Sequence, residues 1–402
     1  MDNSAISQNA ELAGLSAPSG ASLGITAKSS PPQGEIDRRK KRAERYEGLA
    51  FARLWMGKRA AQISPDKHPG DVYRTHDCRF VRRARDVTIK YSPQFKSAHF
   101  TGVATCGSVW ACPVCCALIQ QRRRAELSQL IEWAYAQGYK PCMVTFTFPH
   151  ASFDKLSSLQ SALADAFKRL RQGSPWQRFK ARCGFGGLVR SLEVTHGSNG
   201  WHPHTHELWL IKPLSPSERS DFLADLKARW RKVCQASGLL DADDKAKGFH
   251  FDLHAVDVRF DVSDSDYLAK QDQSRAWGAD REIATGSSKA GRAKGVHPHE
   301  FLIRRGPGDR SSYFEYLDAM KGKSQLFWSH GLKDAVGIQE VSDEVVAQEA
   351  REDSFDLGKV SAAEWDVVRK KRKHAPLLDA AETGDWGQVR LFLRSLGCDP
   401  YS

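Results

Sequence analysis

The chain has 402 residues, with 60 Lys and Arg against 48 Asp and Glu, for a formal net charge of +12. This excess, with a pI near 9.2, favours a polyanionic partner, either nucleic acid or an acidic membrane surface. The sequence contains no apolar run of membrane-spanning length and no apolar N-terminal signal core, which argues against a secreted or membrane-spanning protein. We therefore expect a cytoplasmic protein whose nine cysteines stay reduced or bind metal.

The N-terminal region changes composition near residue 36. Residues 1–35 are rich in Ser, Ala, Gly and Pro without an apolar period, and we predict that they are disordered. Basic residues between positions 38 and 45 then precede Leu49, Phe51 and Trp55, which predicts a basic amphipathic helix. Its cations either contact nucleic-acid phosphates or face solvent.

The central region alternates β-like and helical patterns. Residues 71–116 are β-like and interrupted by cysteines, and residues 117–137 predict a helix. That helix carries our predicted DNA-binding residues, Arg122, Arg123 and Arg124. Further strands are predicted at 143–148, 187–195 and 250–260, and further helices at 157–170, 215–234 and 265–273. This order predicts an α+β fold in which helices flank an antiparallel sheet.

Composition also divides the chain into four parts. After the tail at 1–35, we expect a basic helix and cysteine region at 36–137 and a catalytic domain at 138–338. Residues 339–402 turn acidic, then carry the basic sequence VVRKKRKH and a last helical pattern at 377–396. We interpret this part as an acidic linker followed by a helical tail.

Three histidines stand at alternate positions in GWHPHTHELWL, residues 200–210: His202, His204 and His206. Alternate side chains of a strand share a face, so the three imidazoles project together and Leu208 and Leu210 continue that face into the core. Imidazoles at i and i+2 are placed to bind one metal ion. The segment therefore predicts a metal site rather than three unrelated polar residues.

A carboxylate on the preceding strand completes this site if the two strands form a hairpin. With Thr195 opposite His202, Glu193 falls opposite His204 on the same face. Two histidines and one carboxylate leave coordination positions open, as in a catalytic metal site. This prediction depends on the register, because a shift by one residue would turn Glu193 away.

The cysteines form a second cluster. Cys106, Cys112 and Cys115 lie in CGSVWACPVC, whose Cys-x-x-Cys pair is typical of a structural zinc site. A tetrahedral thiolate site needs a fourth ligand, for which we select Cys78; Cys116 or His76 are the alternatives. The competing interpretation is a group of buried free thiols.

A third motif is SDSDYLAKQ, residues 263–271. On a helix, Tyr267 and Lys270 share a face, and Asp264 lies one turn before them. A tyrosine hydroxyl becomes a nucleophile when a nearby cation favours its phenolate. Tyr313 and Tyr316, in SSYFEYL, are rival nucleophiles that we interpret as packing residues.

Together these motifs resemble the HUH superfamily of single-strand endonucleases, and most closely its rolling-circle plasmid replication initiators. The strand TFTF (145–148) resembles their first motif, WHPHTH the second and DYLAK the third. The resemblance extends over CGSVWACPVC, AWGADREIATG and FEYLDAMKGKSQLFWSHGLK, roughly residues 76–338. It implies a ferredoxin- or RRM-like core with a small zinc-binding element.

The resemblance also implies a reaction. Tyr267 would attack a DNA phosphate at the plasmid origin, keep the 5′ phosphate and free a 3′ hydroxyl that primes the host polymerase. His204 and His206 carry over as ligands of a divalent cation, Mg²⁺ or Mn²⁺, with Glu193 as the third ligand and His202 beside them. Related initiators have a water-activating glutamate about four residues before the tyrosine, where this chain has Ser263 followed by Asp264.

Two other functions are compatible with the same motifs. A single-tyrosine transposase would use similar catalytic residues, and a zinc-dependent DNA-binding regulator would use the histidines for a structural metal. For the initiator, the expected partners are single-stranded or hairpin origin DNA, a host helicase and a host DNA polymerase.

Overall fold

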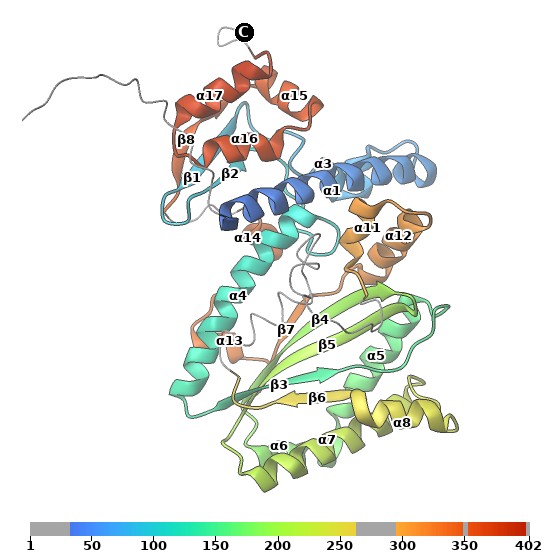
Figure 1. The fold of residues 1–402 in the computed structure, drawn as a ribbon. Helices are drawn as coiled ribbons and strands as arrows, with labels where there is room; N and C mark the ends of the chain where they lie inside the picture. Colours follow the sequence, from blue (N-terminus) through green and yellow to red (C-terminus); the bar gives the residue numbers. More distant parts are fainter. Residues whose placement is uncertain (1–32, 263–294, 349–352, 399–402) are drawn as a thin grey trace, which may run out of the picture.

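The computed structural model describes residues 33–262, 295–348 and 353–398 (Figure 1). The disorder expected for residues 1–32 and the helix expected at 265–273 lie outside these described residues, whereas residues 33–35 begin a helix. Within the described residues, helices pack against two antiparallel sheets, so the predicted α+β class is confirmed. No helix among them is both long enough and apolar enough to cross a membrane.

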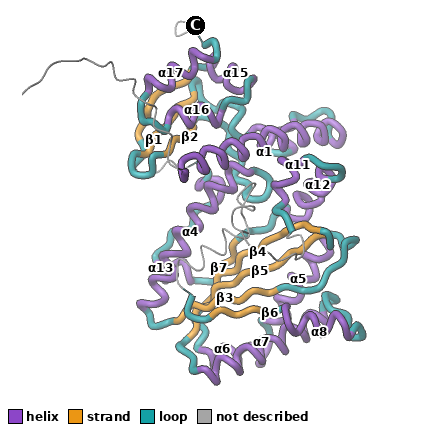
Figure 2. Tube along the Cα trace, in the orientation of Figure 1, coloured by secondary structure: helices purple, strands orange, loops and turns teal. Residues whose placement is uncertain are grey.

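The larger sheet has five strands in the order β6-β3-β5-β4-β7, and every neighbouring pair is antiparallel. The strands are β3 (Lys140–Phe146), β4 (Gly187–Gly197), β5 (Gly200–Ile211), β6 (Val256–Arg259) and β7 (Leu326–Trp328). Along the chain, helices separate β3 from β4 and β5 from β6, which gives a β-α-β-β-α-β unit. β4 and β5 form a continuous hairpin, and β3 lies on the other side of β5 (Figure 2).

Helices cover both faces of this sheet. One face bears Phe146 and Trp209, and the Phe146 ring packs against Trp209, Phe167 and Trp230. The helices on or beside that face are α5 (Leu156–Leu170), α6 (Gly173–Cys183), α7 (Pro216–Ala236) and α8 (Lys245–His254). The opposite face bears Leu208 and Leu210, which share a core with Leu127 and Leu130. Helices α4 (Pro113–Ala136) and α13 (Leu332–Val336) lie on that side.

A second, three-stranded sheet joins two distant parts of the chain. Its order is β2-β1-β8, formed by β1 (Val87–Ser92), β2 (Ser97–Thr101) and β8 (Phe355–Val360). Its apolar face packs against α15 (Ala362–Lys370), α16 (His374–Ala381) and α17 (Trp386–Ser395). Residues that we expected to form a linker and tail thus complete a folded unit begun before residue 100, and the predicted domain boundaries stay predictions.

The basic helix α1 (Gln33–Ile63) lies between the two units (Figure 1). It contacts α16 on one side and α11 (Phe301–Arg304) on another, and it also packs on α4 and α3 (Arg74–Asp77). The remaining described helices are α2 (Pro69–Val72), η1 (Pro298–Glu300), α12 (Asp309–Met320) and α14 (Asp343–Val346). Helix α1 therefore packs against other helices over part of its length and is not a free arm there.

Sequence predictions of local structure differ from the structure in three places. The strand expected at 250–260 is the end of α8 followed by the short strand β6. The alternating Phe249, Phe251 and Leu253 imitate a strand, but Asp244 caps a helix upstream and only Phe251 of the three is buried. The β-like region 71–116 contains β1 and β2, as predicted, but it also includes two short helices and the start of α4. The helix expected at 377–396 is two helices, separated at Gly384, whose φ is +72°.

Candidate functional site: clusters of potential metal ligands

Glu193, His204 and His206 converge on one face of the β4–β5 hairpin. Glu193 pairs with His204, and Thr195 with His202, so the register assumed from the sequence is confirmed. The Oε2 atom of Glu193 is 3.4 Å from Nε2 of His204 and 3.6 Å from Nε2 of His206. Ligand atoms about 2.1 Å from one divalent cation would be roughly 3.0–3.4 Å apart. The three residues therefore fit a shared cation.

Hydrogen bonds on the far side of each ring turn Nε2 toward Glu193. Nδ1 of His206 is 3.0 Å from Oγ1 of Thr145 on β3, and Nδ1 of His204 is 3.3 Å from the His202 carbonyl oxygen. A protonated Nδ1 that donates to each oxygen leaves the Nε2 lone pair available to a metal. Thr145 belongs to the TFTF strand, so that strand supports the site through His206.

His202 has both ring nitrogens engaged elsewhere. Its Nε2 accepts from the Thr147 hydroxyl at 3.2 Å, and its Nδ1 donates to Nε2 of His150 at 2.8 Å. His150 in turn donates from Nδ1 to the Asn199 carbonyl oxygen at 2.8 Å. Burial, reinforced by His204 and His150, lowers the pKa of His202 to about 3. A neutral His202 orients its neighbours and is not placed among the converging groups.

Sequence reasoning missed His150. Burial lowers its pKa too, which fits the neutral ring that accepts from His202. Its signal in the sequence was its position just after the TFTF strand, in TFTFPH.

The cysteine cluster contains the four residues selected from the sequence. Cys78 and Cys115 have sulfur atoms 3.5 Å apart, and the Cys106–Cys115 and Cys112–Cys78 separations are both 3.7 Å. Four thiolates about 2.3 Å from a central ion at tetrahedral angles would be about 3.8 Å apart. All four side chains are buried, and they form one group of potential ligands. The donor set and spacing fit one tetrahedral metal ion.

Two sulfur atoms of the cluster accept hydrogen bonds from backbone amides, while burial raises the pKa of Cys112. The amide of Cys115 donates to Sγ of Cys112 at 3.4 Å, at the first turn of α4, and the amide of Ser108 donates to Sγ of Cys106 at 3.5 Å. Hydrogen bonds from the three neighbouring thiols hold the pKa of Cys115 well below its usual value. A bound cation would extend that preference to the other three sulfurs.

Arg79, adjacent in sequence to Cys78, supplies a buried positive charge. It is 4% exposed and donates to the carbonyl oxygens of Phe100, at 3.3 Å, and Ala347, at 2.7 Å. Burial opposes its charge, but the nearby Cys78 and Cys115 sulfurs outweigh that effect and raise its pKa. A tetrathiolate around a divalent cation carries two net negative charges, so Arg79 offsets part of them.

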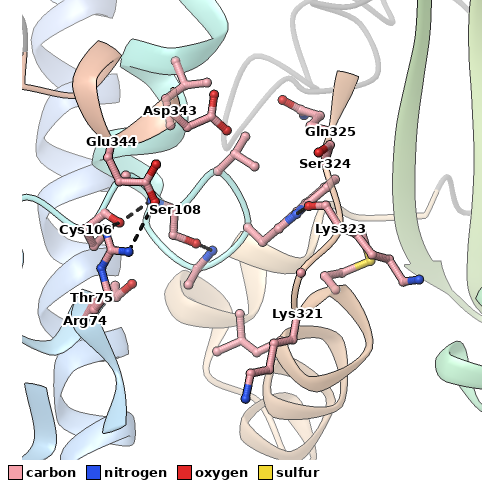
Figure 3. Close-up of a pocket in the computed structure, with 18 of the residues that line it drawn as sticks. Arg74, Thr75, Cys106, Ser108, Lys321, Lys323, Ser324, Gln325, Asp343 and Glu344 are labelled. Atoms are coloured by element: carbon pink, nitrogen blue, oxygen red, sulfur yellow. Dashed lines mark hydrogen bonds and ion pairs between the residues drawn. The ribbon is translucent and has the colours of Figure 1, made fainter. Parts of the chain in front are cut away.

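A cavity of about 1000 Å³ borders the cysteine cluster (Figure 3). Arg74 spans its wall, with one nitrogen 3.2 Å from Glu344 and another 2.7 Å from the Cys106 carbonyl oxygen. On the opposite wall, the Trp110 indole donates to the Lys323 carbonyl oxygen at 2.7 Å. Glu193, His204 and His206 do not line this cavity. The cavity therefore lies beside the cysteine cluster and is separate from the histidine site.

The predicted DNA-binding run divides into residues with different surroundings. Arg123 is held by Glu126, at 2.8 Å, and by Asp343, at 2.8 Å, whereas Arg122 is 47% exposed and 3.7 Å from Glu126. Arg124 is half-buried. Their binding role stays a prediction, with Arg122 the most accessible of the three.

The tyrosines considered as nucleophiles also differ in their surroundings. Tyr267, Lys270 and Asp264 lie outside the described residues. Tyr313 and Tyr316 are completely buried, and the Tyr313 hydroxyl donates to the Ala111 carbonyl oxygen at 2.7 Å. Burial raises the pKa of Tyr313 well above its usual value, which opposes phenolate formation. The packing role predicted for both is confirmed.

Comparisons with known proteins find similarity to replication proteins. Residues 99–246 match the family described as replication protein. Protein rep of Streptomyces lividans is 27% identical over 300 residues, which cover 59% of this chain and 64% of that protein. The neomycin resistance protein of Streptomyces cyanogenus is 30% identical over 168 residues, which cover 33% of this chain and 38% of that protein.

The family match contains Glu193, the three histidines of β5 and three of the four clustered cysteines, whereas Cys78 and Tyr267 fall outside it. The similarity spans less than two thirds of the length of either relative. No solved structure matches the chain. Residues 99–246 nevertheless match the replication protein family, in agreement with the family recognised from the sequence motifs.

Proposed function

We propose that this chain is a plasmid replication initiator that nicks one strand of its origin DNA. The observation that carries the proposal is the convergence of Glu193, His204 and His206 on one hairpin, inside a replication-protein domain. A separate cluster of four cysteines, Cys78, Cys106, Cys112 and Cys115, would hold a structural zinc ion. In this proposal the histidine site performs the chemistry and the cysteine site maintains the fold around it.

The strand order supports an HUH-type core. The β-α-β-β-α-β unit has its four strands ordered β6-β3-β5-β4, so that β5 lies between the two strands of the first β-α-β connection. This is the split β-α-β arrangement of ferredoxin-like folds. The candidate metal-binding residues stand on the two adjacent strands β4 and β5, and Thr145 of β3 supports one of them.

Each residue has a role in the proposed reaction. A divalent cation held by Glu193, His204 and His206, either Mg²⁺ or Mn²⁺, would neutralise charge on the phosphate oxygens as the reaction proceeds. His202 and His150, both neutral, would orient the ligands and add no charge of their own. Lys270 would favour the phenolate of Tyr267, and Asp264 would stand in for the water-activating glutamate of related initiators.

The proposed reaction exchanges one phosphate ester for another. The Tyr267 oxygen forms a bond to the phosphorus as the bond to the 3′ oxygen breaks, and the released oxygen takes up a proton. The phosphotyrosine ester retains the 5′ phosphate, so the strand can later be rejoined without ATP. The free 3′ hydroxyl would then prime a host DNA polymerase, with a host helicase opening the duplex ahead.

A nicking assay with Tyr267→Phe tests the proposal. The substitution removes one hydroxyl and little volume, so folding and DNA binding should be unchanged, while nicking of a single-stranded origin oligonucleotide and the protein–DNA adduct should both disappear. Tyr91→Phe is a matched control, because Tyr91 is a half-buried residue of β1 in the other sheet. Peptide mapping should find the adduct on Tyr267.

Other outcomes have distinct meanings. An adduct on a different tyrosine would show that the nucleophile is wrongly assigned, while the initiator function would stand. DNA binding by wild-type protein with no nicking at any divalent-ion concentration would favour a non-catalytic regulator. Nicking that proceeds without a covalent adduct would indicate attack by water, and the rolling-circle mechanism would be wrong.

A further inference from the structure

Phe51 of α1 lies close to two arginines from distant parts of the chain. The guanidinium carbon of Arg305, just after α11, is 4.1 Å from the centre of the Phe51 ring. The guanidinium carbon of Arg372, in the turn between α15 and α16, is 5.9 Å from the same ring centre. Figure 1 shows α1 between α16 and α11, the two helices that bring these arginines to it. Tertiary folding therefore places two cations around one half-buried aromatic ring.

Both arginines have a backbone conformation that favours glycine. The φ angle is +55° at Arg305 and +53° at Arg372, in the left-handed region. Glycine is the usual residue at such positions after a helix because it has no Cβ to crowd the carbonyl group. An arginine at either position costs stability relative to glycine. The presence of a guanidinium at both positions, near the same ring, therefore calls for a functional explanation.

The surrounding charges leave this surface positive. The Arg372 guanidinium makes no hydrogen bond or ion pair with any residue that the structure describes; only its backbone N–H donates, to the Arg369 carbonyl oxygen at 3.2 Å. Its exposed neighbours Lys370 and Lys373 have no ion pair within the described ranges either. Arg305 contacts Glu47 at 3.2 Å and the Ile303 carbonyl oxygen at 2.8 Å, and both side chains of the Arg305–Glu47 pair are more than one third exposed. The cations of this surface, Arg305, Arg372, Lys370 and Lys373, thus outnumber the Glu47 carboxylate that pairs with Arg305.

We propose that Arg305 and Arg372, held around Phe51, form a clamp for the phosphate backbone of double-stranded DNA. The inference rests on the proposed function, and it adds a binding surface separate from the histidine site. A guanidinium presents a planar fork of donors that matches a phosphate, and stacking on an aromatic ring limits its freedom before binding. Duplex DNA places one phosphate of each strand per about 3.4 Å of helix axis, so two cations around one ring can engage one stretch of backbone.

The left-handed backbone provides a clean test, because Arg372→Gly removes the guanidinium and relieves the strained φ angle. The melting temperature should therefore stay the same or rise, while affinity for a labelled random-sequence duplex should fall several-fold. The slope of log affinity against log salt should become shallower by about one for each guanidinium lost. Arg305→Gln should act in the same direction. Lys168→Gln, an exposed neutralisation on α5, controls for net charge and should change neither quantity.

The readouts separate this clamp from the nicking function. Arg372→Gly should still nick a single-stranded origin oligonucleotide at the wild-type rate. If Arg372→Gly binds the duplex with wild-type affinity and salt slope, the clamp is overturned, as it also is if the loss appears with anionic phospholipid vesicles and not with duplex. If the variant loses duplex binding while wild-type protein never nicks, the clamp stands and the proposed nicking function fails.

Discussion

Glu193 faces His204 directly across the β4–β5 ladder, with 3.4 Å between the carboxylate Oε2 and the imidazole Nε2. Both groups are largely shielded from solvent, since the Glu193 and His204 side chains are 7% and 12% exposed. Glu193 and the two imidazoles converge and offer three ligand atoms to one shared cation. This relationship is the basis of the first prediction.

Glu193→Gln should weaken divalent-cation binding by at least about tenfold, because it removes the anionic ligand and keeps the side-chain size. Isothermal titration with Mn²⁺ measures this without reference to nicking. Glu132→Gln, at an exposed position of α4, is the control and should bind as the wild type does. Equal affinity for Mn²⁺ in Glu193→Gln would show that the three residues do not form the cation site.

Cys112→Ser should lose about one zinc per chain and destabilise the segment that joins β2 to α4, because the remaining three thiols cannot complete a tetrahedral site. Elemental analysis of purified protein gives the zinc content. Cys116→Ser is a demanding control, because Cys116 is the next residue after Cys115 and is equally buried, yet lies outside the cluster. Zinc lost from Cys116→Ser and retained by Cys112→Ser would contradict the ligand assignment.

Arg123→Gln should mainly lower the stability of the fold, whereas Arg122→Gln should mainly lower the affinity for duplex DNA. Arg123 neutralises Glu126, which is 3% exposed, so its loss leaves a buried carboxylate and should cost about 3 kcal/mol of unfolding free energy. Arg122 is 47% exposed, and its replacement should cost less than about 1 kcal/mol while reducing duplex affinity. Urea unfolding and duplex titration separate the two effects. Equal destabilisation by both variants would mean that the Arg123 ion pairs contribute little.

His374→Phe should reduce the sensitivity of the fold to acid. Burial, with Arg369 and Arg53 nearby, lowers the pKa of His374 from 6.5 to about 3. Between these two values the unfolded chain binds a proton that the folded chain does not, so stability falls as the pH falls below about 6.5. Removing this group should make the dependence shallower by about 1.4 kcal/mol per pH unit in that window. The free energy of unfolding at about pH 5 and about pH 7 measures it.

The same slope in His374→Phe and wild type would assign the acid sensitivity to other groups. His330→Gln, at an exposed position, serves as the control substitution.

The candidate site was predictable because it depends on local periodicity. Alternation in β5 fixes which histidines share a face, and a short hairpin fixes their partner on β4. The cysteine cluster was found for a similar reason, since Cys112 and Cys115 belong to one helical turn. These local patterns do not predict which other residues contact the two clusters. His150, which accepts a hydrogen bond from His202, and Arg79, beside the cysteines, reach their positions through tertiary packing.

The composite unit around β1 could not be predicted from the sequence. Residues near 355–360 look like an exposed, charged segment, and only their pairing with β1 makes them a strand. The α8 error has a related cause, because alternation at Phe249 and Phe251 imitates a strand wherever the burial of each residue is unknown. In both cases long-range contacts overruled the local pattern.

The pairing of β1 with β8 has a consequence for synthesis on the ribosome. Val87 of β1 pairs with Val360 of β8, so one edge of β1 stays unpaired while more than half of the chain is translated. During that interval Tyr46 and Phe80 also lack the His374 ring that later packs between them. The nascent protein therefore has an exposed strand edge and an incomplete apolar cluster. Chaperones would bind both features, and both favour premature self-association. A chain released by a stop codon before Phe355 would keep that edge permanently and should aggregate, even with its histidine site fully translated.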